Sequence, residues 1–149
     1  MQIYLTSAIK QAEAYTRRVI DPATWQTYLT SFYDFTFDIA PVVALSSVKY
    51  YDKNNVLQTL ASSEYTLINK GADAYAELEF ESGLPELYDR AEPVVVEFTA
   101  GYAAYPSDLT GTILQYAADL FETRTNDVAG AMSRVTMDFH KRLFPYKLL

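Results

Sequence analysis

With 149 residues the chain has the length of a single domain, and a folded chain of this size buries about 70% of its unfolded surface, so an ordinary apolar core suffices. It contains no cysteine, which excludes a disulfide framework, a thiolate metal site and a cysteine nucleophile. The formal net charge of −7 argues against a surface that grips DNA or an anionic membrane, because binding phosphates requires clustered Lys and Arg. No apolar run approaches the roughly 18 residues of a membrane span, so we expect a soluble protein with no membrane partner.

The first predicted element is an amphipathic helix over residues 3–20. Apolar residues recur at helical spacing on one side, and polar residues occupy the other side. Arg17 and Arg18 are expected near the end of this helix, where positive charge complements the helix dipole. Asp21-Pro22 is predicted to end it.

Residues 24–100 read as a β insertion of about six short strands. Alternating apolar and polar residues, rich in β-branched and aromatic types, predict strands in the ranges 24–30, 35–39, 45–51, 56–60, 65–68, 75–80 and 94–99. Turn residues at Asp52–Asn55 and at Asn69–Gly71 predict two hairpins. Gly101 follows the last strand, which would complete an antiparallel sheet.

After Pro106 the pattern becomes helical, and Ser107 is a candidate N-cap. One apolar face predicts a helix over residues 108–125, and residues 126–136 have little pattern and contain Gly130, so we interpret them as a mobile loop. A short helix over 137–143 would stop before Pro145 and leave the tail 144–149. The predicted fold class is α+β: a small bundle of N- and C-terminal helices with an inserted antiparallel sheet, forming one domain over 1–149.

Residues with catalytic potential are few. The only histidine, His140, lies in a basic stretch with Lys141 and Arg142, and no nearby residue marks a Ser-His-Asp site, although sequence does not exclude one. A zinc site would have to be built from this His and carboxylates. No phosphate-binding loop, dinucleotide fingerprint or EF-hand loop is present. We therefore expect no catalytic residues, no metal and no cofactor.

Glu77, Glu79 and Glu81 are spaced by two, which on a strand places three carboxylates on one face. Paired carboxylates serve as general acid and base in glycoside hydrolysis when their environments separate their pKa values. A row of Glu is more often a solvated face, because water relieves the mutual repulsion. A carboxylate-based glycoside hydrolase is thus a remote alternative.

Several runs of residues then carry a resemblance to a known family. They are Glu13-Ala14-Tyr15-Thr16-Arg17-Arg18 with Trp25, Val48-Lys49-Tyr50-Tyr51-Asp52, Gln58-Thr59-Leu60, Ser63-Glu64-Tyr65, Val96-Glu97-Phe98-Thr99-Ala100-Gly101-Tyr102 with Pro106 and Leu109, Leu120-Phe121-Glu122-Thr123-Arg124, and Leu143-Phe144-Pro145-Tyr146-Lys147. In this collinear order the chain resembles the head-tail connector (adaptor, or head completion) proteins of long-tailed phages and gene transfer agents. It departs from them in two ways: members commonly carry a further N-terminal helical segment, and Leu84-Pro85 stands where a Trp-Pro pair is common.

The resemblance implies a virion structural protein that forms a closed ring, expected to be a dodecamer, beneath the portal vertex. It would extend the DNA channel, let double-stranded DNA pass without specific binding, and connect the filled head to a stopper or tail-completion protein. Its place would be the virion neck, after assembly in the host cytoplasm. The alternative within the virion is a stopper or tail-completion protein.

Three surfaces are candidates for these contacts. The expected portal-docking tail comprises Phe144, Pro145, Tyr146, Lys147, Leu148 and Leu149, for which packing back on the subunit's own core is the alternative. The candidates for contacts between subunits are Arg17, Arg18, Asp52, Lys53, Asn54 and Asn55, with a solvated helix end as the alternative for the arginines. The face of Glu77, Glu79 and Glu81 either lines the lumen or meets solvent.

Overall fold

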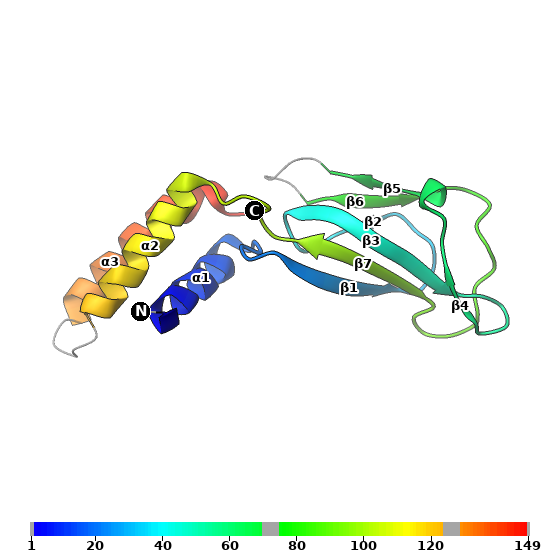
Figure 1. The fold of residues 1–149 in the computed structure, drawn as a ribbon, viewed down its shortest axis with the longest axis horizontal. Helices are drawn as coiled ribbons and strands as arrows, with labels where there is room; N and C mark the ends of the chain where they lie inside the picture. The colour runs from blue at the N-terminus through cyan, green and yellow to red at the C-terminus, as the bar shows by residue number, and fades with distance from the viewer. Residues whose placement is uncertain (1, 70–74, 124–128, 149) are drawn as a thin grey trace. The chain divides into compact units, whose positions relative to one another are not determined.

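The computed structural model describes residues 2–69, 75–123 and 129–148, with the backbone alone described at 129–133. The chain forms two compact units (Figure 1). One combines residues 1–20 with 103–149 and is called the helical unit here. The other comprises residues 21–102 and is called the β unit. Helices in one unit and antiparallel strands in the other confirm the predicted α+β class.

The helical unit consists of α1 (Gln2–Thr16), α2 (Ser107–Glu122), α3 (Ala129–Leu143) and a short 3-10 turn, η2 (Phe144–Tyr146). Its core is built from the faces that the three helices turn toward one another. The buried residues are Ala8, Ala12, Thr16, Leu109, Ile113, Tyr116, Ala117, Phe139 and Leu143. Tyr116 stacks on Phe139 with ring centroids 3.9 Å apart, and its hydroxyl donates a hydrogen bond to Gln11 Oε1 at 2.7 Å. Ala8 and Ala12 of α1 are fully buried, and small side chains of this kind let neighbouring helices approach closely.

Three helix predictions are corrected. The first helix ends at Thr16 instead of residue 20, because Arg17 takes the left-handed conformation (φ 59°) and stops the helix. Ser107 does not cap α2: it is the first helical residue, and Pro106 precedes it without a side-chain cap. The expected loop over 126–136 is wrong from Ala129 onward, where α3 already runs. Residues 124–128, which include the end predicted for the 108–125 helix, lie outside the described residues.

The β unit contains two antiparallel sheets in place of the single sheet expected. A four-stranded sheet has the order β1-β7-β3-β4, formed by β1 (Ala23–Leu29), β7 (Val94–Ala100), β3 (Val42–Tyr51) and β4 (Leu57–Thr59). A three-stranded sheet has the order β2-β6-β5, formed by β2 (Phe35–Thr36), β6 (Glu77–Phe80) and β5 (Tyr65–Ile68). A 3-10 turn, η1 (Ser62–Glu64), precedes β5.

Both predicted hairpins are confirmed as strand pairs, β3 with β4 and β5 with β6. Of the second turn, residues 70 and 71 lie outside the described part of the chain. Three strands are shorter than predicted: β2 covers only Phe35–Thr36, β4 covers Leu57–Thr59, and β6 begins at Glu77. The pairing that sequence did not reveal is long-range, since β7 lies between β1 and β3 and pairs with both along its length.

The core of the β unit lies between the two sheets. On β7 the residues Val94, Val96, Phe98 and Ala100 are buried, while the residues between them are half-buried. Phe98 meets Phe37 of the segment after β2 at 4.6 Å between ring centroids. The strand therefore has the buried face that its valines predicted, and it contributes that face to the contact between sheets.

Candidate interaction surfaces

The C-terminal tail packs partly on its own unit. Leu148 is only 4% exposed, and its backbone N–H donates to the carbonyl of Thr16, the last residue of α1, at 3.0 Å. The carbonyl of Tyr146 accepts a hydrogen bond from Arg18 Nε. These bonds join the tail to the end of α1, so Tyr146 and Leu148 are structural parts of the helical unit. Leu149 lies outside the described residues.

Tyr146 also ties the tail to the start of α2. Its hydroxyl donates to the carboxylate of Asp108, and this hydrogen bond lowers the pKa of Asp108 below its ordinary value of 3.8. Asp108 lies in the first turn of α2, where a negative charge also favours the helix dipole. The tail is thus bound to two helix ends: a backbone hydrogen bond joins it to the end of α1, and the Asp108 carboxylate joins it to the start of α2.

The beginning of the tail, in contrast, is open to solvent. Phe144 is 62% exposed, and it borders a shallow hollow of about 390 Å³ lined also by Tyr15, Met137, His140 and Lys141. We call these five residues the α3 patch. Tyr15 and His140 stack at 4.2 Å between ring centroids, and the ammonium group of Lys147 lies 5.3 Å from the Tyr15 ring. An exposed apolar surface with a basic rim is typical of a site that binds another protein.

The portal-docking role of residues 144–149 remains a prediction, and the structure restricts which of them are free for it. Phe144 and Pro145 are exposed, Tyr146 and Lys147 are half-buried, and Leu148 is buried. The rest of the patch was not connected with the tail from the sequence, because Tyr15 lies on α1, far away in the sequence, and only the fold brings it beside Met137, His140 and Phe144. The spacing of Val135, Phe139 and Leu143, which recur every four residues, was a signal that α3 extends before residue 137, but these residues mark the side of the helix that packs inward and not the patch.

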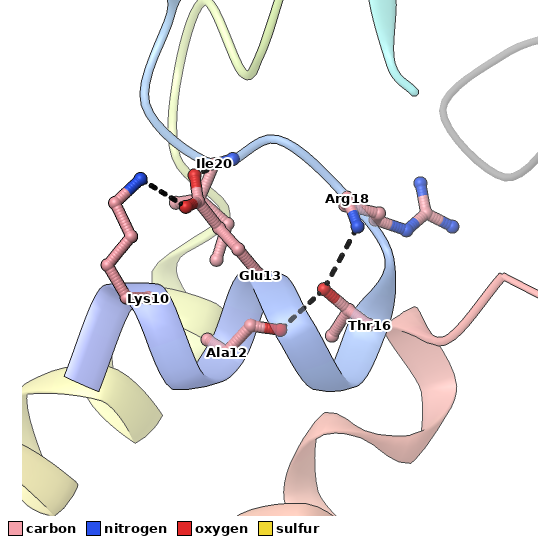
Figure 2. A network of polar contacts seen from close by, with 6 residues as sticks. All are labelled: Lys10, Ala12, Glu13, Thr16, Arg18 and Ile20. Atoms are coloured by element: carbon pink, nitrogen blue, oxygen red, sulfur yellow. Dashed lines mark hydrogen bonds and ion pairs between the residues drawn. The ribbon is translucent and has the colours of Figure 1, made fainter. Parts of the chain in front are cut away.

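Arg17 and Arg18 lie just after α1, and their environments differ. Figure 2 shows the local network: Thr16 Oγ1 donates to the carbonyl of Ala12 at 2.7 Å, and the backbone N–H of Arg18 donates to Thr16 Oγ1 at 3.4 Å. Arg17 is exposed, whereas Arg18 is buried. The expected solvated helix end is therefore wrong for Arg18. A contact between subunits stays a prediction for both, and the exposure favours Arg17.

Glu13 completes the turn after α1. One carboxylate oxygen accepts the backbone N–H of Ile20 at 3.0 Å, and the other pairs with Lys10 Nζ at 2.6 Å (Figure 2). Ile20 is buried although it lies outside the helix. The apolar pattern thus marked a buried residue correctly while overstating the length of the helix.

The turn Asp52–Asn55 is built around one carboxylate. Asp52 Oδ1 accepts the backbone N–H groups of Asn54 at 2.9 Å and Val56 at 3.1 Å, and Oδ2 accepts Gln58 Nε2 at 3.0 Å. The hydrogen bond from Val56, followed by that from Gln58, lowers the pKa of Asp52 below 3.8. Asn55 takes a positive φ of 61°, which Asn tolerates. The turn exposes Lys53, Asn54 and Asn55 to solvent, as a contact loop requires, and their contact with a neighbouring subunit stays a prediction.

The three glutamates do not form a compact site. Glu77 and Glu79 share a face of β6, with Glu77 half-buried and Glu79 exposed, and Glu81 follows the strand and is exposed. That these glutamates line the lumen of a ring remains a prediction. Among residues 2–69, 75–123 and 129–148, no group of three or more His, Asp or Glu residues could hold a metal ion. His140, stacked on Tyr15, belongs to the α3 patch.

No helix in the described part of the chain is long and apolar enough to cross a membrane. No protein-family model matches the sequence, and no curated protein matches it.

Solved structures do match the fold. The chain is similar to a chain in the neck of an empty gene transfer agent particle, computed with C6 symmetry, with a TM-score of 0.71 and 24% identity over 98% of this chain and 75% of that chain. It is also similar to a chain in the virion of a native gene transfer agent particle, with a TM-score of 0.72 and 22% identity over 98% of this chain and 75% of that chain. A chain in the neck of a native gene transfer agent particle, computed with C12 symmetry, matches with a TM-score of 0.71 and 22% identity over 98% of this chain and 80% of that chain. The predicted resemblance is therefore confirmed for the fold: this chain has the fold of a neck component of a phage-like particle.

Proposed function

We propose that this protein is a structural component of a virion neck, where it forms a dodecameric ring beneath the portal and extends the DNA channel toward the stopper or tail. The observation that carries the proposal is the fold similarity over 98% of the chain to chains in neck and virion structures, one of them computed with C12 symmetry. The role is structural and requires no catalytic residue, cofactor or metal.

The distribution of charge supports a channel through which DNA passes without being held. The β unit contains 13 acidic residues (Asp and Glu) and four basic residues (Lys and Arg), which gives a net charge of −9. The helical unit contains six acidic and eight basic residues, which gives a net charge of +2. A surface that carries excess negative charge repels the phosphate backbone. The β unit is accordingly the part of the subunit that suits a DNA channel.

The helical unit carries the surface that suits docking to the portal. The α3 patch places Phe144 and Met137, 62% and 56% exposed, beside Lys141. Aromatic and Met side chains are enriched in protein interfaces, and a basic rim favours an acidic partner surface. We infer that the portal presents an apolar surface bordered by carboxylates to this patch.

The decisive test is to image particles assembled with the tagged full-length chain. Subunits in a ring that touches the portal directly would support the proposal. A ring separated from the portal by another protein would assign the chain to a stopper or tail-completion position instead. Absence from the neck would overturn the proposal.

A binding assay tests the patch separately. Phe144→Asp and Met137→Asp should each weaken co-migration with the portal at least about tenfold, because a charge replaces an apolar contact at the interface. Ile3→Asp is the matched control, since Ile3 is 81% exposed on α1 and is not part of the patch. Equal binding by all three variants would remove the docking role from the patch.

A further inference from the structure

The charged residues of the two sheets lie only on the inner strands. Among the strand residues that the structure describes, the charged ones are Lys49 on β3, Glu77 and Glu79 on β6, and Glu97 on β7. The four edge strands, β1, β2, β4 and β5, carry none. This is unusual for a unit whose net charge is −9, and it reverses the common arrangement.

Edge strands are normally the place where charge is needed. An edge offers a row of unpaired backbone N–H and C=O groups to any passing strand, and natural proteins block it with Lys, Pro, bulges or shortened strands. β2, β4 and β5 are at least short, with two, three and four residues. β1 has seven residues and contains neither Pro nor a charged residue.

β1 is also open to solvent along most of its length. Five of its seven residues are exposed, and only Leu29 is buried. Trp25 is 38% exposed and Tyr28 50% exposed, so two large aromatic side chains stand at this edge. All seven residues pair with β7 in unbroken register, so the strand contains no bulge. A long, regular, uncharged edge of this kind is a template for another strand.

The opposite edge of the same sheet is β4, which pairs with the end of β3 through three residues. All three β4 residues are exposed, and Leu57 with the preceding Val56 adds about half-exposed apolar surface. One subunit therefore presents two different uncharged edges on opposite sides of one sheet. A cyclic ring requires two different, complementary surfaces on every subunit, because each contact is head-to-tail.

We propose that β1 of one subunit pairs with the β4 edge of the next copy of this chain, so that the four-stranded sheet continues from subunit to subunit. The proposal rests on the ring of the proposed function and names the contact that closes it. The occupant is a second copy because every subunit presents both edges, on opposite sides of one sheet, as a head-to-tail contact requires. Two β units of net charge −9 repel each other, and edge strands without charged residues of their own keep that cost low. Trp25 and Tyr28 then cover the apolar side chains of Val56 and Leu57.

Disulfide trapping tests the pairing, and the chain is well suited to it because it contains no cysteine. Thr59→Cys on β4 is combined in three double variants with Thr24→Cys, Gln26→Cys or Tyr28→Cys, which cover successive registers on one sheet face. Within one subunit the two edges are three strand spacings apart, about 14 Å, whereas a disulfide needs Cα atoms within about 7 Å. Any bond between them must join two subunits.

The full-length double variants are oxidised at millimolar concentration, and their mass is measured under denaturing conditions. At least one should give a ladder of covalent oligomers, whereas each single-cysteine variant stops at a dimer at most. Efficient dimers from a single β1 cysteine would show β1 pairing with itself and would overturn the proposal. Monomers from all three double variants would also overturn it.

Two outcomes separate this proposal from the neck function. A ring detected by mass photometry in which no double variant cross-links would overturn the edge pairing and leave the ring standing. A cross-linked ladder from a chain that particle images do not find in the neck would support the pairing and overturn the neck function.

Charge placed on the edge provides the reverse test. Thr24→Lys with Tyr28→Lys should reduce association roughly tenfold, because two cross-strand contacts are lost and the edge is blocked. Ser62→Lys with Ser63→Lys is the matched control, since both serines are exposed in η1 of the same unit and lie on no strand. Equal association of the two double variants would contradict the role of β1.

Discussion

The β unit and the helical unit expose their apolar side chains in different settings. In the β unit, Trp25 and Tyr28 lie on one uncharged edge strand and Leu57 on the other, within a net charge of −9. In the helical unit, Met137 and Phe144 lie at the end of α3 beside Lys141, within a net charge of +2. The difference supports the proposed division of roles, with contacts to identical subunits on the β unit and contacts to a different, acidic protein on the helical unit.

The proposed division would also separate recognition through backbone hydrogen bonds from recognition through side chains. An edge strand offers hydrogen-bonding groups at a fixed spacing, which suits a repeated contact between copies. The α3 patch offers aromatic, Met and Lys side chains around a shallow hollow, which suits a partner of different shape. Variants that act on one unit alone are therefore the way to test the division.

The largest effect is expected from Gly101→Ala in the β unit. Gly101 has φ 119°, and a Cβ there would lie 2.7 Å from the Cα of Pro22 and 2.8 Å from the carbonyl oxygen of Asp21. Strain and overlap with backbone should together lower the free energy of unfolding by about 2–4 kcal/mol. Chemical denaturation monitored by circular dichroism measures the loss.

Gly111→Ala in α2 is the matched control, since nothing lies within 4 Å of a Cβ built there. This change should raise the free energy of unfolding by about 0.5–1 kcal/mol, because Ala favours the helix more than Gly does. Similar effects of the two substitutions would contradict the close approach of Gly101 to residues 21–22.

The next largest effect on the free energy of unfolding is expected in the tail of the helical unit, where Leu148 and Phe144 should differ. Leu148→Ala should lower the free energy of unfolding by about 2 kcal/mol or more, because it empties a buried site. Phe144→Ala should change it by no more than about 0.5 kcal/mol, because the ring is mostly in water, yet it should weaken binding to the portal. The opposite order of stabilities would show that the tail is detached from its own unit. Deleting residues 145–149 would mix the two effects, since it removes Tyr146 and Leu148 together.

The sequence predicted best what depends on neighbouring residues. β5 has the bounds that its pattern indicated, and the hairpin of β3 and β4 follows from the turn residues at 52–55. The division into two sheets was not predictable in this way. β7 pairs with β1 about 70 residues earlier in the chain, and β2 pairs with β6 rather than with a neighbour in sequence, and no local pattern encodes such partners.

The errors in the helical unit have local causes. Thr16 can donate its hydroxyl to a carbonyl four residues earlier and Arg17 takes a left-handed conformation, so α1 stops where apolar spacing alone would continue it to Ile20. α3 was missed over 129–136 because Gly130 and a weak pattern outweighed the spacing of Val135, Phe139 and Leu143. The α3 patch was missed for a different reason: it combines Tyr15 of α1 with Met137, His140 and Lys141 of α3, and of its residues only Phe144 was identified as part of a candidate surface.

The smallest expected effect concerns pH. The hydrogen bond from Tyr146 lowers the pKa of Asp108 in the folded state below 3.8, so its contribution to stability is complete above that pH and is lost as the pH falls through the folded-state pKa. Tyr146→Phe removes the donor and should flatten this part of the pH dependence of the free energy of unfolding, measured by urea denaturation between pH 6 and pH 3. Asp52 also has a lowered pKa, but its hydrogen-bond donors are Val56 and Gln58 in the β unit. The part of the pH dependence that is due to Asp52 should therefore persist in Tyr146→Phe and disappear in Asp52→Asn. A Tyr146→Phe variant with the full dependence of the wild type would show that the tail does not hold the start of α2.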